Sequence, residues 1–180
     1  AEVVGVETYN DGEKDFRAQL TKLKGANPDA LYIAGYYTEA AKIAQQAKEQ
    51  GLNVQLLGAD GFYSPVLVEL GGDAVEGAVF TAGFFTDDPS ENAQNFVKAY
   101  KDKFNEEPDM FAAQAYDAAM ILLNALKKTN GQGGEALQKE MANTKDFPGI
   151  TGTTSFTENG DALKDIIILK VENGKFAKLR

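Results

Sequence analysis

The chain has 180 residues, 43% hydrophobic and 25% charged, which is a composition typical of a globular protein. Its 18 basic and 27 acidic residues give a net charge of −9, and such an acidic surface repels the phosphates of nucleic acids. The absence of cysteine and histidine excludes disulfides, thiol nucleophiles, serine–histidine triads and nearly all zinc and haem sites. The spacing of a calcium loop is also missing, so we expect no cofactor and no metal.

The first 82 residues alternate between strand-like and helix-like segments. Strands are predicted over residues 2–7, 31–35, 54–58 and 77–82. Helices are predicted between them, with Asp15 and Thr38 as N-caps of the first two. Ser64 and Pro65 are typical of an N-cap and the first helical position of the third. The nearly all-apolar run at 31–35 favours an α/β fold with a parallel sheet covered on both faces.

The remainder of the chain is first helical and then strand-like. Asp88-Pro89-Ser90-Glu91 predicts a capping box with Pro89 at the first helical position. The next helix, residues 110–129, is apolar around much of its girth, so we expect it to be deeply buried. A shorter helix and three strands follow, over residues 135–143, 152–157, 166–171 and 175–179. Asn173-Gly174 predicts a tight hairpin between the last two strands.

The candidate site lies in the segments that follow the predicted strands, because ligands of open parallel sheets bind beyond the carboxyl ends of the strands. The segments after the second and third strands contain Tyr36, Tyr37, Asp60 and Phe62. One carboxylate without a second titratable partner is a poor catalytic set, but with aromatic rings it suits a small ligand that carries a cation. The alternative stays open that the rings only pack the protein and that Asp60 is a turn residue before Gly61.

Two other patterns in the chain are weaker. Residues 131–136 match a dinucleotide-binding fingerprint by letter, but they follow a predicted helix instead of a strand, which favours a surface loop. A receiver domain would need an acidic pair after its first strand, and Thr8-Tyr9-Asn10-Asp11 does not supply that pair cleanly. No apolar run reaches the roughly 18 residues of a membrane span.

A series of motifs runs along the whole chain in a fixed order. They include Asp15-Phe16, Pro28-Asp29-Ala30-Leu31, Gly35-Tyr36-Tyr37-Thr38-Glu39, Gly58-Ala59-Asp60-Gly61, Ala115-Tyr116-Asp117-Ala118 and Gly152…Phe156…Asn159-Gly160-Asp161. This series resembles the branched-chain amino-acid binding proteins of ABC transporters, the leucine/isoleucine/valine type of periplasmic binding protein. The resemblance covers the C-terminal half of such a protein. It implies the type I periplasmic-binding-protein fold, in which two α/β lobes, each a parallel sheet sandwiched by helices, enclose the ligand.

The resemblance also implies a division of the chain and a set of site residues. Residues 1–82 would be βα units of the second lobe, residues 83–161 a helical segment returning to the first lobe, and residues 162–180 a C-terminal hairpin or crossing segment. By the same resemblance Tyr36 lines the site, Asp60 holds the ligand ammonium, and Phe111 closes the side-chain pocket, with Tyr37 and Phe62 beside them. Asp60 is shorter than the glutamate that the family also uses. The groups that grip the ligand carboxylate would lie upstream.

The function implied by the resemblance is the capture of a small amino acid for uptake, without catalysis, followed by delivery to a membrane permease. The location would be periplasmic or extracellular, with a lipid anchor as an option in the full-length protein. One alternative is a ligand-binding sensor domain of a receptor with the same fold. An enzyme on a flavodoxin-like sheet is a poor third, because histidine and cysteine are missing. The exposed sheet edge and apolar helix would be covered by the missing N-terminal half or by a swapped homo-oligomer.

Overall fold

The computed structural model describes residues 1–179 and divides them into two compact units. The first unit combines residues 1–82 with the chain from Ile167 onward, and the second unit is Gly83–Ile166. Two chain crossings therefore connect the units, one after Ala82 and one before Ile167.

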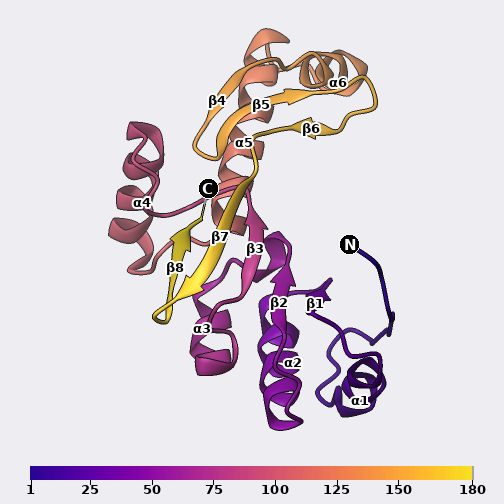
Figure 1. Ribbon diagram of the computed structural model, residues 1–180. Coiled ribbons are helices and arrows are strands. Elements are labelled where there is room, and N and C mark those ends of the chain that lie inside the picture. The colour runs from indigo at the N-terminus through magenta and orange to yellow at the C-terminus, as the bar shows by residue number, and fades with distance from the viewer. Residues whose placement is uncertain (180) are drawn as a thin grey trace. The chain divides into compact units, whose positions relative to one another are not determined.

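The first unit is built on a mixed five-stranded sheet (Figure 1). Its strands, in spatial order, are β1 (Ala30–Ile33), β2 (Gln55–Gly58), β3 (Val79–Ala82), β7 (Ile167–Glu172) and β8 (Lys175–Lys178). The first three strands are parallel, β7 pairs antiparallel with β3, and β8 pairs antiparallel with β7. The predicted α/β class is thus confirmed, with a sheet that is mostly but not wholly parallel.

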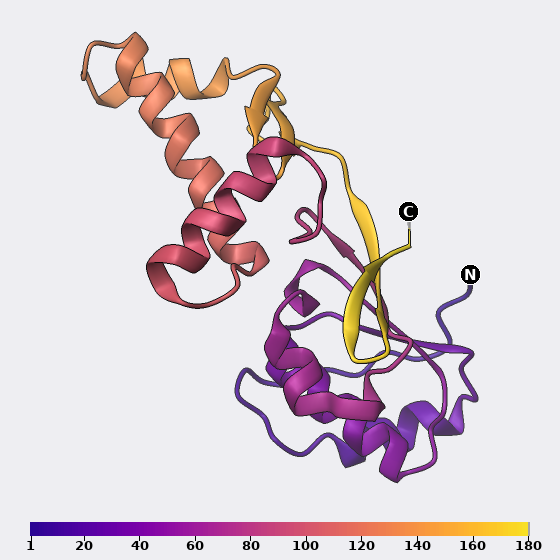
Figure 2. The same cartoon turned by 90° about the vertical axis from the view of Figure 1, so that its left-hand side faces the viewer.

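Helices cover one face of this sheet. They are α1 (Arg17–Gly25), α2 (Tyr37–Glu49) and α3 (Pro65–Gly71), with short 3₁₀ turns η1 (Asp60–Phe62) and η2 (Gly72–Ala74). Right-handed crossovers between successive parallel strands place α2 and α3 on the same face, and Figure 2 shows them packed there. Leu31 and Ile33 of β1 are buried, whereas Tyr32 between them is 59% exposed. Within the described residues, which span about half of the family fold, the helices thus cover one face of the sheet and leave Tyr32 on the other face exposed.

The helix starts agree only in part with the predicted caps. Ser64 is confirmed as the N-cap of α3, because its Oγ accepts from the Val66 amide at 3.3 Å and Pro65 is the first helical residue. The N-caps of α1 and α2 are instead Phe16 and Tyr36, one or two residues away from the predicted Asp15 and Thr38. Neither makes a side-chain cap bond. The Asp15 carboxylate nevertheless accepts from the amide of Arg17, the first residue of α1, at 3.2 Å.

The predicted strand at residues 2–7 is not formed. This segment is extended without ladder pairing, and Val3, Val4 and Val6 are 53–79% exposed. It lies along α1, where Glu7 forms an ion pair with Lys22 at 2.9 Å. A β-branched sequence makes a strand only when a neighbouring strand pairs with its backbone, and none does so within residues 1–179.

Aromatic rings fill the core of the first unit around Phe80 of β3. Phe80 is 1% exposed, and its ring centroid lies 5.8 Å from that of Phe62, 6.3 Å from Tyr63 and 5.5 Å from Phe176. These four rings come from β3, η1 with its C-cap, and β8. The cluster therefore ties the C-terminal strand to the turn that carries the candidate site.

The hairpin between β7 and β8 is confirmed. Asn173 and Gly174 both have positive φ, as a type I′ turn requires, and Glu172 pairs with Lys175 across it. The Glu76 carboxylate accepts from the backbone amides of Asn173 at 2.8 Å and Gly174 at 3.2 Å. The turn is thus held by a residue nearly a hundred positions earlier in the chain.

The second unit contains three helices and a small antiparallel sheet (Figure 1). Its elements are α4 (Glu91–Phe104), α5 (Met110–Lys128), α6 (Gly134–Ala142), β4 (Phe147–Gly149), β5 (Gly152–Phe156) and β6 (Ala162–Leu163). The capping box predicted for α4 is wrong. Ser90 is the N-cap but makes no side-chain cap bond, and Pro89 precedes the helix. The Asp88 carboxylate accepts from the Ser90 amide at 3.0 Å, just before the helix begins.

The long helix α5 is less buried than predicted. Its buried residues form a single stripe, Met110, Ala113, Asp117, Ile121 and Ala125. Large apolar side chains elsewhere on the helix are 37–49% exposed, namely Phe111, Tyr116, Met120, Leu122 and Leu123. The described residues of this unit cover one side of α5 and leave apolar area on the others.

Candidate functional site

The two parallel strands β1 and β2 bring the predicted site residues to one edge of the sheet. Ile33 at the end of β1 pairs with Gly58 at the end of β2. Tyr36 follows the first of these residues by three positions and Asp60 follows the second by two. Sequence positions 24 residues apart therefore become neighbours at the carboxyl edge of the sheet.

Glycines allow the two loops to touch. A Cβ on Gly61 would lie 2.6 Å from the Gly35 carbonyl oxygen and 3.2 Å from Cδ1 of the Tyr36 ring. A side chain at position 61 would therefore force the loops apart. The Tyr36 ring lies directly beside the residue that follows Asp60, and Tyr36 and Asp60 are both exposed.

The other predicted residues occupy different surroundings. Tyr37 is the half-buried first residue of α2, next to Tyr36. Phe62 is 1% exposed, and a Cβ on Gly58 would lie 2.6 Å from its ring carbons, so in this structure it packs beneath the loop. Phe111, at the start of α5, is 39% exposed and belongs to the second unit. The structure thus brings four of the five residues into one unit.

The first-unit residues form a polar and aromatic edge with one carboxylate. Asp60 offers an acceptor for a cationic group, and the Tyr36 phenol and ring offer a hydrogen bond and an apolar face. Among residues 1–179, no group of three or more acidic side chains is placed to hold a metal ion. The arrangement is therefore suited to binding a small cationic or zwitterionic molecule.

The sequence pattern did not point to Tyr9, which contacts this edge. Its hydroxyl donates to the Ala34 carbonyl oxygen at 3.1 Å, at the end of β1. Burial is the main cause that raises the pKa of Tyr9, and the nearby carboxylates of Glu39 and Asp11 raise it further. The only sequence signal was its position in the loop before α1.

Asp117 of α5 holds a buried polar network in the second unit. Its carboxylate accepts from the Ile150 amide at 2.8 Å, from the Thr151 amide at 2.9 Å, and from the Thr151 hydroxyl. Lys164 donates to that hydroxyl, and its Nζ lies 4.0 Å from Asp117 Oδ2. Burial lowers the pKa of Lys164, and the Asp117 charge partly opposes this shift. The network fastens the β4–β5 turn to α5.

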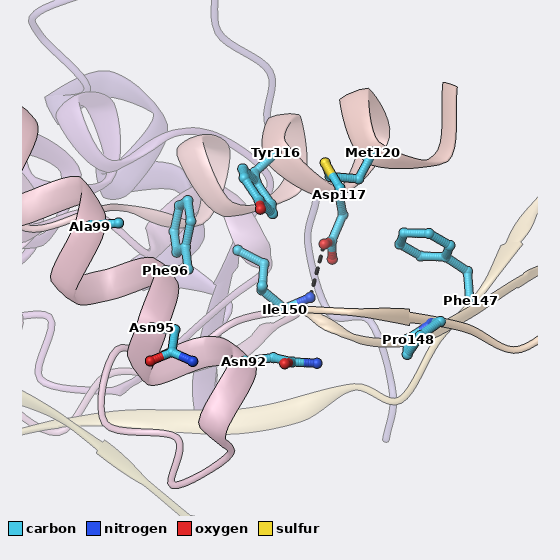
Figure 3. A pocket seen from close by; sticks show the side chains of 10 residues that line it. All are labelled: Asn92, Asn95, Phe96, Ala99, Tyr116, Asp117, Met120, Phe147, Pro148 and Ile150. Carbon is cyan, nitrogen blue, oxygen red and sulfur yellow. Dashed lines mark hydrogen bonds between the residues drawn. The ribbon is translucent and has the colours of Figure 1, made fainter. Parts of the chain in front are cut away.

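A pocket of about 310 Å³ lies beside this network (Figure 3). It is lined by Asn92, Asn95, Phe96, Ala99, Tyr116, Asp117, Met120, Phe147, Pro148 and Ile150. None of the five predicted site residues is among them. Figure 3 shows Phe96 and Tyr116 close together on facing helices, and their ring centroids are 5.1 Å apart. The pocket adjoins the exposed side of α5, where Tyr116 and Met120 lie.

Comparison with known proteins identifies the family to which this chain belongs. A family model described as "Periplasmic binding protein" matches residues 1–175, so the chain belongs to the periplasmic binding proteins. Membership of this family confirms the expectation of a binding protein rather than an enzyme. No helix among the described residues is long and apolar enough to cross a membrane.

Relatives of known name support the resemblance to branched-chain amino-acid binding proteins. A Leu/Ile/Val-binding protein homolog of Brucella abortus is 34% identical over 173 residues, which cover 96% of this chain and 46% of the relative. The leucine-, isoleucine-, valine-, threonine- and alanine-binding protein of Pseudomonas aeruginosa is 32% identical over 157 residues, covering 86% of this chain and 41% of its own length.

Solved structures give the same result for the fold. The leucine-binding protein LivK of Thermotoga maritima superposes with a TM-score of 0.87 at 38% identity, covering 96% of this chain and 49% of that protein. LivJ of Streptococcus pneumoniae, solved in complex with isoleucine, has a TM-score of 0.80 at 37% identity, and the match covers 94% of this chain and 49% of LivJ. The type I periplasmic-binding-protein fold and the resemblance are thereby confirmed. The chain spans about half the length of the relatives it matches.

Proposed function

We propose that this chain is the C-terminal half of a solute-binding protein that captures a branched-chain or similar amino acid for an ABC transporter. The observation that carries the proposal is the contact between the Tyr36 and Asp60 loops at the carboxyl edge of the β1–β2 pair. The ligands named for the relatives, among them isoleucine in the LivJ complex, are amino acids with an ammonium group that suits Asp60. The protein would work in the periplasm or outside the cell.

The proposed mechanism is closure of two lobes around the ligand. Asp60 would pair with the ammonium group, and Tyr36 and Tyr37 would pack against the aliphatic part or bond to it. Phe62 would support the loop from below, and the resemblance assigns Phe111 to the side-chain pocket. The remaining half of the protein would grip the carboxylate, and the closed form would be delivered to a membrane permease.

A thermal-shift screen of the full-length protein tests this function. A ligand that binds only the native state must raise the midpoint of unfolding as its concentration rises. Leucine, isoleucine and valine at millimolar concentration are expected to raise that midpoint, whereas glutamate and lysine are not. A protein that responds to none of the aliphatic amino acids, but to another class of solute, would contradict the proposal.

The substitution Asp60→Ala in the full-length protein is expected to weaken amino-acid binding strongly. The loss should be about 1.5–3 kcal/mol, the usual value for a hydrogen bond to a charged group. That is roughly a ten- to more than hundredfold increase in Kd by isothermal titration calorimetry.

The matched control for this experiment is Asp73→Ala. Asp73 lies in η2 of the same unit and is also exposed, so its removal lowers the charge by the same amount at another place. The control should bind as the unaltered protein does. Equal affinities for Asp60→Ala and Asp73→Ala would remove Asp60 from the site.

The uncovered surfaces predict that the 180-residue chain alone does not stay a compact monomer. Among residues 1–179, strand β1 has a neighbour on one side only, and the exposed side chains of α5 with the adjoining pocket form an apolar surface. Monomers rarely expose such surfaces, and free strand edges recruit other chains. We propose that the other half of the protein covers them and that a swapped oligomer does so when this half is absent.

Light scattering of the purified 180-residue chain is the corresponding measurement. The expected result is a dimer or larger species that becomes a one-to-one complex when the N-terminal half is added as a separate chain. The complex should bind isoleucine, and the isolated chain should bind it weakly or not at all. A stable monomer that ignores the added half would refute this part of the proposal.

A further inference from the structure

One side chain, Tyr9, connects the segment before α1 to the loop that carries the candidate site. Its hydroxyl donates to the Ala34 carbonyl oxygen at 3.1 Å, across 25 residues of sequence. Residues 34–36, which we call the site loop, run from the end of β1 to Tyr36, the N-cap of α2. The bond therefore joins the site loop to a segment that is not part of the sheet.

The Tyr9 ring is itself fixed by the core. It meets the ring of Phe16 edge to face, with centroids 5.3 Å apart and an interplanar angle of 87°. Phe16 is 1% exposed, and its amide donates to Oε1 of Gln46 on α2 at 2.6 Å. Because Phe16 is held by both packing and a hydrogen bond, the Tyr9 hydroxyl is held against the site loop by more than its own bond.

The Tyr9 phenol lies so close to the site loop that only a glycine fits at position 35. A Cβ at this position would overlap the phenol oxygen and lie 3.3 Å from the ring carbon Cζ. Gly35 is not among the residues with positive φ, so the phenol and not the backbone conformation opposes a side chain there. The Gly35 carbonyl also lies against Gly61. The site loop is therefore held between Tyr9 and the residue that follows Asp60.

We propose that Tyr9 is a positioning residue of the amino-acid site, which fixes the site loop and thereby the ring of Tyr36 relative to Asp60. This inference rests on the proposed function. A tyrosine hydroxyl is ordinarily protonated at neutral pH and can therefore donate. Burial, and then the carboxylates of Glu39 and Asp11, raise the pKa of Tyr9 further, in the same direction.

The test uses Tyr9→Phe, Gly35→Ala and the double variant in the full-length protein. Two quantities are measured: the Kd for isoleucine by calorimetry, and the hydrogen-exchange rates of amides 35–40 in the unliganded protein. Tyr9→Phe keeps the ring contact but loses the hydroxyl, so Kd should rise about two- to tenfold, as for one lost hydrogen bond. Exchange in the site loop and the first turn of α2 should accelerate.

The double variant distinguishes positioning from a general loss of stability. Gly35→Ala alone should impair binding more than Tyr9→Phe, because its methyl group meets the phenol oxygen. Adding Tyr9→Phe to Gly35→Ala removes that oxygen and should restore part of the affinity and part of the protection from exchange. Two purely destabilising changes would instead add.

The control is Tyr100→Phe, which removes a hydroxyl from α4 in the second unit and should change neither quantity. Wild-type affinity in Tyr9→Phe, or a double variant weaker than Gly35→Ala, would overturn the positioning role. If the variants show the expected differences in exchange but the wild-type protein binds no amino acid, the proposed function and the ligand role of Tyr9 are refuted, while the coupling between Tyr9 and the site loop stands.

Discussion

Replacing Asp117 by alanine should lower the free energy of unfolding by about 3–5 kcal/mol, the usual cost of removing one partner from a buried ionic group. The Asp117 side chain is 3% exposed and accepts from two backbone amides and one hydroxyl. Alanine would leave these three donors without their acceptor, and it would remove the carboxylate that lies 4.0 Å from the partly buried ammonium of Lys164. Urea-induced unfolding of the full-length protein, followed by circular dichroism, measures the loss.

Two further variants locate the cause of that loss. Asp117→Asn keeps one side-chain oxygen, so it should cost less than alanine. Asp102→Ala removes an exposed carboxylate from α4 and should change stability by no more than about 0.5 kcal/mol. If Asp117→Ala were as mild as Asp102→Ala, the network would not be what fastens the β4–β5 turn to α5.

The second large effect is expected for Phe80→Ala, at about 3–5 kcal/mol of unfolding free energy, the range for deleting a buried aromatic side chain. Phe80 is 1% exposed and lies among Phe62, Tyr63 and Phe176. Its removal leaves a cavity under the turn that carries Asp60, so ligand affinity should fall along with stability.

The same deletion at an exposed position is the control. Phe104, at the end of α4, is 51% exposed, and Phe104→Ala should cost less than about 1 kcal/mol. Chemical denaturation of both variants compares the two sites directly. Similar losses at positions 80 and 104 would show that the ring cluster around Phe80 is not the core of the first unit.

Features with local causes were predictable from the sequence. The Ser64-Pro65 start of α3 needs only a hydroxyl cap and a fixed φ, and both act within one turn of helix. The Asn173-Gly174 hairpin needs two residues that tolerate positive φ, which these two supply. In each case the residues that determine the structure are adjacent in the chain.

Features that depend on a partner elsewhere were predicted wrongly. Residues 2–7 have the composition of a strand, but within residues 1–179 no strand pairs with them. Apolar residues on most sides of α5 predicted a deeply buried helix, but only one stripe of its residues is buried. In both cases the sequence carries the preference of the segment but not the neighbour that would satisfy it.

The candidate site was partly accessible to the same reasoning. The rule that ligands bind at the carboxyl edge of parallel strands led to Tyr36 and Asp60, whose loops touch in the structure. The contacts of Tyr9 and Asp117 join residues 25 to 34 positions apart, with no spacing rule that would reveal them. Side chains that act on a distant loop become visible only when the fold is known.

Comparing isoleucine with its deaminated analogue 3-methylpentanoate by calorimetry on the full-length protein tests the central claim most directly. The two ligands share the carboxylate and the branched chain, and they differ in the ammonium group assigned to Asp60. The account predicts that isoleucine binds at least about tenfold more tightly, as expected for a hydrogen bond to a charged group, and that Asp60→Ala removes most of this preference. Equal affinity for the two ligands, or a preference that persists in Asp60→Ala, would contradict it.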